Sequence, residues 1–191
     1  MQRSFSQKSE VNIMGKTKIE RFQAKHLGVA RSFSVDENSC SNPQFFLDFL
    51  IYNAISGSKT GKETTFVYVE VGENEEPQRI IGYISLKASS LIDEGEQQNM
   101  GRPSLEISML AVDKEYIKRG VGRALLKHAL FCCAQIRKYA GVEYLLVCSE
   151  PKAVNFYKHT LGFKDVGEYC SIPRDMWNGA CVPLYIKLPE T

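Results

Sequence analysis

The fold of this chain is decided by residues 105–127, which read LEISMLAVDKEYIKRGVGRALLK. Apolar residues dominate up to Val112 and are typical of a strand, Gly120 and Gly122 mark a turn, and the residues after them follow a helical pattern. A strand that enters a helix through such a turn leaves unpaired backbone N–H groups and the positive end of the helix dipole at one spot. That spot favours a phosphate or a pyrophosphate, and the glycines let the backbone approach it without a Cβ clash.

The glycine pair alone leaves an ordinary structural turn open as the alternative, because glycines occur in turns of every kind. The spacing fits neither a Walker loop, which needs Gly-Lys-Ser/Thr, nor the complete G-x-G-x-x-G fingerprint of dinucleotide sites. Cationic side chains close to the turn would strengthen an anion site, and these are Lys118, Arg119, Arg123 and Lys127.

Strand and helix patterns alternate on both sides of this stretch. Strands are predicted over 18–22, 64–71, 79–86, 104–112, 142–148, 163–169 and 182–188. Helices are predicted over 24–33, 43–55, 120–139 and 151–160, with loops over 88–103 and around Trp177, and a flexible tail over 1–16. The order β-α-α-β-β-β-α-β-α-β-β predicts an α/β (α+β) class, with a mixed sheet covered by helices on both faces.

Length and charge limit the function further. The chain has 191 residues, which suits a single domain, predicted over 17–191. Lys and Arg number 24 and Asp and Glu 22, and this balance argues against a protein that coats nucleic acid. No apolar run reaches the roughly 18–20 residues of a membrane span, and no secretory signal is visible. We therefore expect a cytoplasmic location and no membrane partner.

The six cysteines are Cys40, Cys132, Cys133, Cys148, Cys170 and Cys181. None forms a C-x-x-C pair and no histidine lies at ligand spacing from two of them, so no zinc or other metal site is expected. In a chain of this length without a signal peptide, the expectation is free thiols in a reducing compartment.

A second motif gives the anion site a context. The sequence AVNFY at 153–157 is followed by LGF at 161–163. Together with the glycine turn, it resembles the GNAT superfamily of N-acetyltransferases, where the turn usually reads Gln/Arg-x-x-Gly-x-Gly/Ala and the late motif Ala-x-x-Phe/Leu-Tyr, then Gly-Phe. Ile117 stands where Gln or Arg is usual, and Glu150 where Asn often precedes the alanine. The resemblance covers 18–188 and implies a GNAT fold: a mixed, mostly antiparallel sheet of about six or seven strands, flanked by about four helices, with a splay between the central parallel strands.

The resemblance implies acetyl-CoA as co-substrate and no metal. In that family the amides of the turn bind the pyrophosphate, and the bulged, splayed strand before the turn pairs with the pantetheine arm like an added strand. By position, the residues that would hold acetyl-CoA are Leu110, Ala111, Val112, Lys118, Arg119, Gly120, Val121, Gly122, Arg123 and Asn155.

The implied reaction is direct attack of an amine on the thioester carbonyl. Tyr157 matches the family's usual general acid, which protonates the departing thiolate, and a core aromatic is the alternative. A lysine-type amine costs roughly 4–5 kcal/mol to deprotonate at pH 7, so a base helps. Glu106 is the candidate base because it lies on the strand that leads into the site, and a solvent-facing carboxylate is the alternative. The backbone N–H of Ala111 or Val112 would polarise the acetyl oxygen.

The acceptor is the open question. The main expectation is an amine of a small molecule or a protein. The segments FFLDFL at 45–50, TFV at 65–67 and LAVD at 110–113 look like the branch that includes toxins of toxin–antitoxin modules, which acetylate the α-amine of charged tRNA. That alternative implies aminoacyl-tRNA and an antitoxin as partners, and a homodimer is a further option. Ser108 and Met109 stand where those toxins usually show Gly-Arg, and a net charge of +2 is modest for a tRNA-binding protein. A non-catalytic module that binds acetyl-CoA or a partner is the third alternative.

Overall fold

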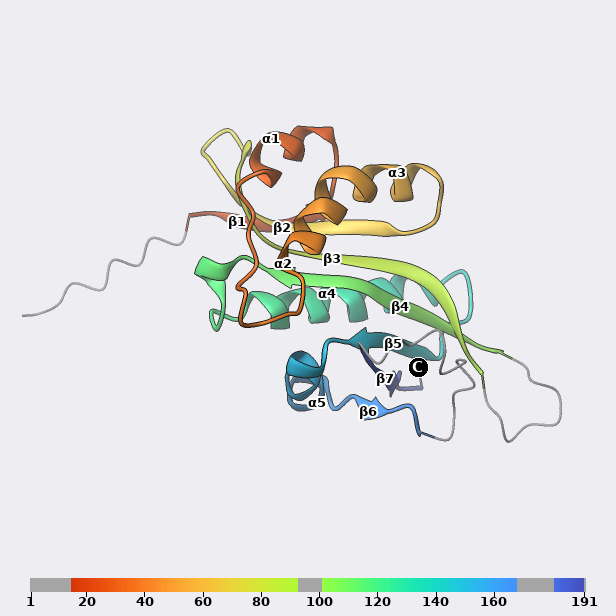
Figure 1. The fold of residues 1–191 in the computed structure, drawn as a ribbon. Helices are drawn as coiled ribbons and strands as arrows, with labels where there is room; N and C mark the ends of the chain where they lie inside the picture. Colours follow the sequence, from red (N-terminus) through yellow and green to blue (C-terminus); the bar gives the residue numbers. More distant parts are fainter. Residues whose placement is uncertain (1–14, 93–100, 168–180, 191) are drawn as a thin grey trace, which may run out of the picture.

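The computed structural model describes residues 15–92, 101–167 and 181–190 (Figure 1). Their strands form one seven-stranded sheet in the order β1-β2-β3-β4-β5-β7-β6. Neighbouring strands are antiparallel, except β4 and β5, which run parallel. The predicted mixed, mostly antiparallel sheet is therefore confirmed. The strands are β1 (Thr17–Arg21), β2 (Thr64–Val71), β3 (Pro77–Ile92), β4 (Gly101–Val112), β5 (Tyr144–Ser149), β6 (Lys164–Asp165) and β7 (Val182–Lys187).

Helices cover both faces of the sheet. On one face lie α1 (Leu27–Ala30), α2 (Pro43–Asp48) and α3 (Ala54–Lys59), grouped in red to orange in Figure 1. On the other face lie α4 (Val121–Ile136) and α5 (Val154–Leu161). Each face of the sheet has its own buried cluster. In one, Leu50 and Ala54 pack with Val67. In the other, Leu125 and Tyr157 pack with Ile107.

The helices begin where the sequence provides caps. Pro43 occupies the first turn of α2, and the Asn42 side chain accepts a hydrogen bond from the backbone N–H of Phe45 at 3.2 Å. The helix predicted over 43–55 consists of α2, a π-helical turn over Phe49–Asn53, and α3. The helix predicted over 24–33 is a 3-10 turn over Ala24–His26 followed by α1.

The hairpin formed by β3 and β4 is longer than predicted. The loop expected over 88–103 is wrong at both ends, because β3 continues to Ile92 and β4 begins at Gly101, with Ala88 opposite Leu105 and Ile92 opposite Gly101. Leu91 is buried while its neighbours are more exposed, so this polar stretch follows the two-residue period of a strand. The strand predicted over 163–169 is described only as the short β6. The tail over 1–14, Tyr169 and the loop around Trp177 lie outside the described residues.

The expectation of free thiols is wrong for two cysteines. Cys148 and Cys181 form a disulfide, with their Cα atoms 5.5 Å apart. The antiparallel pairing of β5 with β7 places Cys148 opposite Pro183 and so brings Cys181 alongside it. Cys40, Cys132 and Cys133 are free, as expected, and burial raises the pKa of the Cys132 and Cys133 thiols to about 11. Cys170 lies outside the described residues.

Candidate functional site

The site lies where β4 and β5 separate. Their parallel pairing ends at Ile107 opposite Val147, although β4 continues to Val112 and β5 to Ser149. Residues 110–112 remain paired with β3 on their other side. The backbone of β4 therefore presents an edge toward β5 that β5 does not cover, and an extended chain can add to such an edge. The splay implied by the resemblance is confirmed.

A β-bulge turns the backbone of β4 at this point. Ser85 lies opposite Met109 and Leu86 opposite Ile107, so Ser108 is the extra residue between them. Its hydroxyl donates a hydrogen bond to the Glu63 carboxylate at 2.5 Å. The bulge follows Ile107, the last residue of β4 that pairs with β5, and a bulge of this kind bends the strand locally.

A cavity of about 160 Å³ lies between β4 and β5 where the two strands separate. Phe45 and Phe46 of α2 close one side, and Ser108 lines it from the bulge. The end of β5 supplies Glu150, and α5 supplies Tyr157. The disulfide between Cys148 and Cys181 also forms part of the wall. The cavity thus lies beside the open edge of β4, with a carboxylate, a phenol and two aromatic rings around it.

The glycine turn after β4 has the backbone geometry of an anion site. Lys118 and Gly120 both adopt left-handed conformations, with φ of +61° and +84°. Gly120 is the N-cap of α4 and has no side chain to cap it, so the N–H groups of Val121, Gly122 and Arg123 have no partner within the helix. These donors and the helix dipole converge on an exposed surface, which suits a phosphate or pyrophosphate.

A network of charged side chains holds this turn in place. Asp113 is fully buried at the end of β4, and its carboxylate lies 3.0 Å from the Arg79 guanidinium. Asp113 also accepts hydrogen bonds from the backbone N–H groups of Ser34 and Glu115, both at 3.1 Å. The guanidinium of Arg79 lies over the Tyr116 ring, 5.0 Å from its centroid. These contacts hold residues 113–116, at the start of the connection between β4 and α4.

The structure brings together the two motifs that the sequence predicted to act together. Gly122, in the first turn of α4, lies next to Phe156 of α5 and Val112 at the end of β4. Asn155 is exposed on α5, immediately before Phe156. The residues predicted to bind acetyl-CoA therefore follow the chain from the open edge of β4 to the start of α4, with Asn155 on the neighbouring α5, and their role in binding stays a prediction.

Tyr157 is almost completely buried, at 5% exposure, and lines the cavity. Its ring packs edge-to-face against Phe156 and Phe163, with centroids 5.2 and 5.5 Å away. Burial raises the pKa of the Tyr157 phenol above its ordinary value. The phenol is therefore protonated across the neutral pH range and can donate a proton or a hydrogen bond to a group inside the cavity.

Glu106 is placed differently from Tyr157. It lies opposite Lys87 on β3, with a carboxylate oxygen 3.0 Å from the Lys87 ammonium, and it accepts a hydrogen bond from Ser89 at 2.9 Å. It lines a neighbouring cavity of about 80 Å³ instead of the one that holds Tyr157. The base role predicted for Glu106 therefore requires its carboxylate to leave Lys87.

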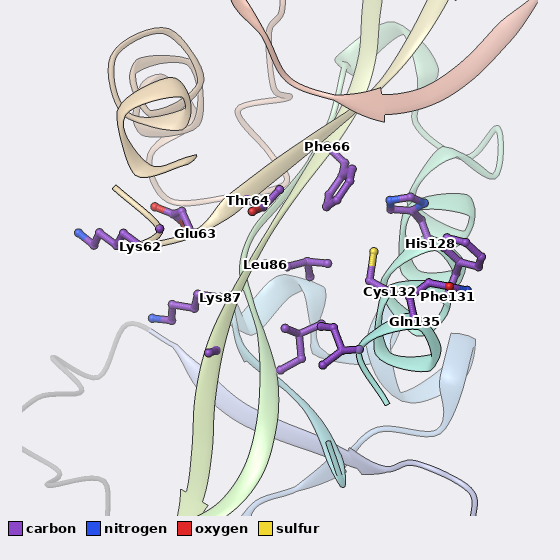
Figure 2. A pocket seen from close by; sticks show the side chains of 14 residues that line it. Lys62, Glu63, Thr64, Phe66, Leu86, Lys87, His128, Phe131, Cys132 and Gln135 are labelled. Carbon is purple, nitrogen blue, oxygen red and sulfur yellow. The ribbon is translucent and has the colours of Figure 1, made fainter. Parts of the chain in front are cut away.

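A larger apolar pocket, of about 480 Å³, lies between α4 and the sheet (Figure 2). Phe66, Leu86 and Phe131 line it, and His128 stacks edge-to-face on Phe66 with ring centroids 4.5 Å apart. Burial lowers the pKa of His128. Its Nε2 is buried without a hydrogen-bond partner in the described part of the chain, so His128 is a packing residue, with no carboxylate to make it a base.

Among the residues that the structure describes, no group of three His, Cys, Asp or Glu side chains could hold a metal ion. No helix within the described ranges is both long and apolar enough to span a bilayer.

Comparison with known proteins shows which family has this architecture. The acetyltransferase (GNAT) domain profile matches residues 62–165, which is more than half of the chain and includes the turn, the splay and α5. The chain belongs to the GNAT acetyltransferase family. The motifs that sequence reasoning selected are thus those of an acetyl-CoA-dependent enzyme family, and the GNAT fold is the observed one.

Solved structures with the same fold include several toxins. A bacterial toxin is 18% identical, with a TM-score of 0.68 and coverage of 91% of this chain and 92% of that one. AtaT complexed with acetyl-methionyl-tRNAfMet is 16% identical, with a TM-score of 0.70 and coverage of 90% and 95%. A tyrosine-to-phenylalanine variant of AtaT, bound to the C-terminus of the antitoxin AtaR and acetyl-CoA, is 21% identical, with a TM-score of 0.64 and coverage of 90% and 92%. At these identities the likeness shows the fold.

Sequence reasoning did not find several residues of the cavity wall. Phe45 and Phe46 carried a helical pattern but no sign that they face β5. Ser108 and Glu150 depart from family patterns in the sequence, but neither departure indicates a place in the cavity wall. Cys181 reaches the site through the pairing of β7 with β5, which no local signal reports.

Proposed function

We propose that this GNAT acetyltransferase transfers the acetyl group of acetyl-CoA directly to the α-amine of an aminoacyl-tRNA. The observation that carries the transferase part is the junction of three features: an uncapped helix start after a left-handed turn, an open strand edge, and a buried tyrosine beside that edge. The tRNA acceptor is supported by the solved toxins of the same fold, one of which holds an acetylated aminoacyl-tRNA.

Acetyl-CoA would lie along the surface described above. The backbone N–H groups of 118–123 would bind its pyrophosphate, and the exposed Lys118, Arg119 and Arg123 would add positive charge around it. The backbone of 110–112 would pair with the pantetheine arm as an extra strand, which places the thioester at the splay beside the cavity.

The transfer then needs two proton movements. The neutral amine attacks the thioester carbonyl carbon, the carbonyl oxygen becomes negative, and the backbone N–H of Ala111 or Val112 stabilises it. The C–S bond breaks, and Tyr157 gives its proton to the departing sulfur. The amine nitrogen loses a proton to a base or to water, and Glu106 is the proposed base. The tyrosine regains its proton from solvent.

An α-amine suits this site because it needs little help from a base. With a pKa of about 7.7, it costs roughly 1 kcal/mol to deprotonate at pH 7, compared with roughly 4–5 kcal/mol for a lysine side chain. A site in which Glu106 is paired with Lys87 is therefore better matched to an α-amine than to a lysine.

The exposed face near the turn provides charge for a polyanion. Lys114, Lys118, Arg119, Arg123 and Lys127 are all exposed between the end of β4 and the second turn of α4. Such a group of cations could bind backbone phosphates of the acceptor stem as well as the phosphates of CoA. An antitoxin that covers this face would block both, and we propose a protein of that kind as the regulatory partner.

The test is acetyl transfer from radiolabelled acetyl-CoA to three acceptors: bulk aminoacyl-tRNA, a panel of small amines, and lysine-containing peptides. Label should appear on aminoacyl-tRNA and be released when the ester bond is hydrolysed, while uncharged tRNA stays unlabelled. Label on small amines or peptides alone would overturn the tRNA acceptor. No binding heat with acetyl-CoA and no thiol release with any acceptor would overturn the transferase itself.

A further inference from the structure

Glu150 is a carboxylate in the cavity wall that the mechanism above does not use. It follows β5 directly and lines the same cavity as Tyr157. We propose that Glu150 binds the ammonium form of the acceptor amine at the entrance of the cavity and so determines that the enzyme selects a primary amine, which releases one proton to water before its neutral form attacks the thioester. This inference rests on the proposed acetyl transfer and adds the group that recognises the acceptor.

The position of Glu150 is fixed by local structure. Its backbone carbonyl accepts hydrogen bonds from the N–H of Ala153, at 2.9 Å, and from the Ser149 hydroxyl, also at 2.9 Å. Its side-chain carboxylate accepts a hydrogen bond from the Ser41 hydroxyl at 3.0 Å. Ser41 immediately precedes the Asn42 cap of α2, the helix whose Phe45 and Phe46 form the opposite wall. The carboxylate is therefore held at the junction of β5 and α2.

Among the described residues, no cationic side chain compensates the charge of Glu150. Within the described residues it forms no ion pair, whereas Glu106 is paired with Lys87. Lys152, two residues further on, donates instead to the backbone carbonyl of Asn38 at 3.1 Å. A half-buried carboxylate without a cation is stabilised when a cation arrives, and an incoming ammonium would supply one.

Glu63, a further carboxylate near the splay, is not positioned for this role. It reaches the cavity only through the Ser108 hydroxyl, and its methylene group lies 3.0 Å from the position a Cβ on Gly57 of α3 would take. Figure 2 shows its carboxylate directed toward the side of the sheet away from His128. Glu63 thus supports the bulge, and among the described residues Glu150 is the carboxylate that lines the cavity.

The size of the cavity and the sign of the charge together define the ligand class. A space of about 160 Å³ admits the amine end of an acceptor and leaves a nucleotide outside. The negative charge of Glu150 opposes phosphate there and favours a primary ammonium, whose three N–H donors can reach the carboxylate together with other acceptors in the wall. The phosphates of the acceptor would remain on the cationic surface near the turn.

The experiment compares wild type, Glu150→Gln and Ser41→Ala, with Glu143→Gln as the matched control at the other end of β5. Acetylation of aminoacyl-tRNA is measured in competition with the same tRNA treated with nitrous acid, which carries a hydroxyl in place of the α-amine. In wild type the deaminated tRNA should compete poorly. In Glu150→Gln, kcat/KM should fall by about ten- to hundredfold through KM, and the deaminated tRNA should compete about as well as the amine form.

The remaining variants separate recognition from folding. Ser41→Ala keeps the carboxylate and should lose only a few fold in kcat/KM, while Glu143→Gln and the acetyl-CoA affinity of all variants should match wild type. An unchanged preference for the amine in Glu150→Gln, in an enzyme that does acetylate aminoacyl-tRNA, would overturn this inference and leave the proposed function standing. Failure of wild type to acetylate aminoacyl-tRNA would instead overturn the proposed function.

Discussion

Gly122 lies against the Cζ end of the Phe156 ring: a Cβ at Gly122 would be 3.0 Å from Cζ of that ring and 3.6 Å from a methyl carbon of Val112. This contact joins the start of α4 to the helix that carries Tyr157 and to the open edge of β4. The glycine is thus needed for close packing as well as for the approach of a phosphate. Any side chain at position 122 must move Phe156, the neighbour of the proposed general acid.

Substitution at Gly122 should reduce acetyl-CoA affinity, and an aspartate should reduce it more than an alanine. Gly122→Ala should weaken binding modestly through displacement of Phe156. Gly122→Asp should weaken it by roughly tenfold or more, because a carboxylate would face the pyrophosphate. Calorimetric titration with acetyl-CoA measures both. Gly28→Asp is the control, because a Cβ at Gly28 in α1 would meet nothing within 4 Å. Wild-type affinity in Gly122→Asp would contradict the proposed cradle.

Replacement of Tyr157 by phenylalanine should remove the proton donor and keep the packing. The Phe156 and Phe163 contacts involve the ring, so folding should be retained. Loss of a general acid typically lowers turnover by about 10²–10⁴-fold, while acetyl-CoA affinity should stay within a factor of about two of wild type. Single-turnover kinetics isolate the chemical step. Turnover equal to wild type in that step would assign Tyr157 to the core alone.

Glu106→Gln distinguishes a base from a partner of Lys87. If the carboxylate accepts the amine proton, the substitution should remove the acidic limb of the pH profile of kcat/KM. If Glu106 only pairs with Lys87 across the strands, the profile should keep its shape and only stability should fall, by about 1 kcal/mol or less for a half-exposed pair. The base role proposed above predicts the first outcome, and Lys87→Met, which removes the ion pair alone, serves as the matched comparison.

The disulfide between Cys148 and Cys181 should contribute to stability. The two cysteines are 33 residues apart in sequence, and closing a loop of that length in the unfolded chain is worth about 3–4 kcal/mol in the chain-entropy model. Cys148→Ser and reduction with dithiothreitol should therefore lower the melting temperature to a similar extent. Cys132→Ser, at a free cysteine, should leave the effect of dithiothreitol unchanged. A wild-type melting temperature insensitive to dithiothreitol would contradict the prediction.

His128 should make the protein less stable in mild acid. Burial lowers its pKa in the folded state, so the unfolded chain binds a proton first as the pH falls below about 6.5. The contribution is fully present above that pH and is lost as the pH falls toward the folded-state pKa. His128→Phe should flatten the free energy of unfolding between roughly pH 5 and 7, as measured by denaturant titration. The same substitution at the exposed His159 is the control. If the free energy of unfolding depends equally on pH in His128→Phe and in wild type, the assignment is refuted.

The parts of the fold with strong local signals could be predicted from the sequence. The strand over 64–71 has the same bounds in the structure. It is rich in β-branched and aromatic residues, and its side chains alternate between buried and half-buried positions. The turn at Gly120 was predicted because two glycines stand between a strand pattern and a helical pattern, and in the structure Gly120 is the N-cap of α4, with a φ of +84°.

Features that depend on strand register could not be predicted. The Lys87–Glu106 pair exists because β3 and β4 align those residues, and the disulfide exists because β5 and β7 align Cys148 near Cys181. Register is set by the whole sheet and leaves no mark on neighbouring residues in sequence. The same holds for Glu150, whose closeness to α2 follows from packing between elements more than one hundred residues apart in the chain, as its bond to Ser41 shows.

The early end of the pairing between β4 and β5 has a consequence for solvent. The main-chain amides along the free edge can bond to water while the gap is empty, and they exchange their hydrogens with it. An extended molecule that pairs with this edge replaces that water. If CoA pairs there as proposed, the same few amides should become slow to exchange when it binds, with or without its acetyl group. On the same proposal, CoA released by the reaction would compete with acetyl-CoA for the same backbone hydrogen bonds, and its departure would limit the next turnover.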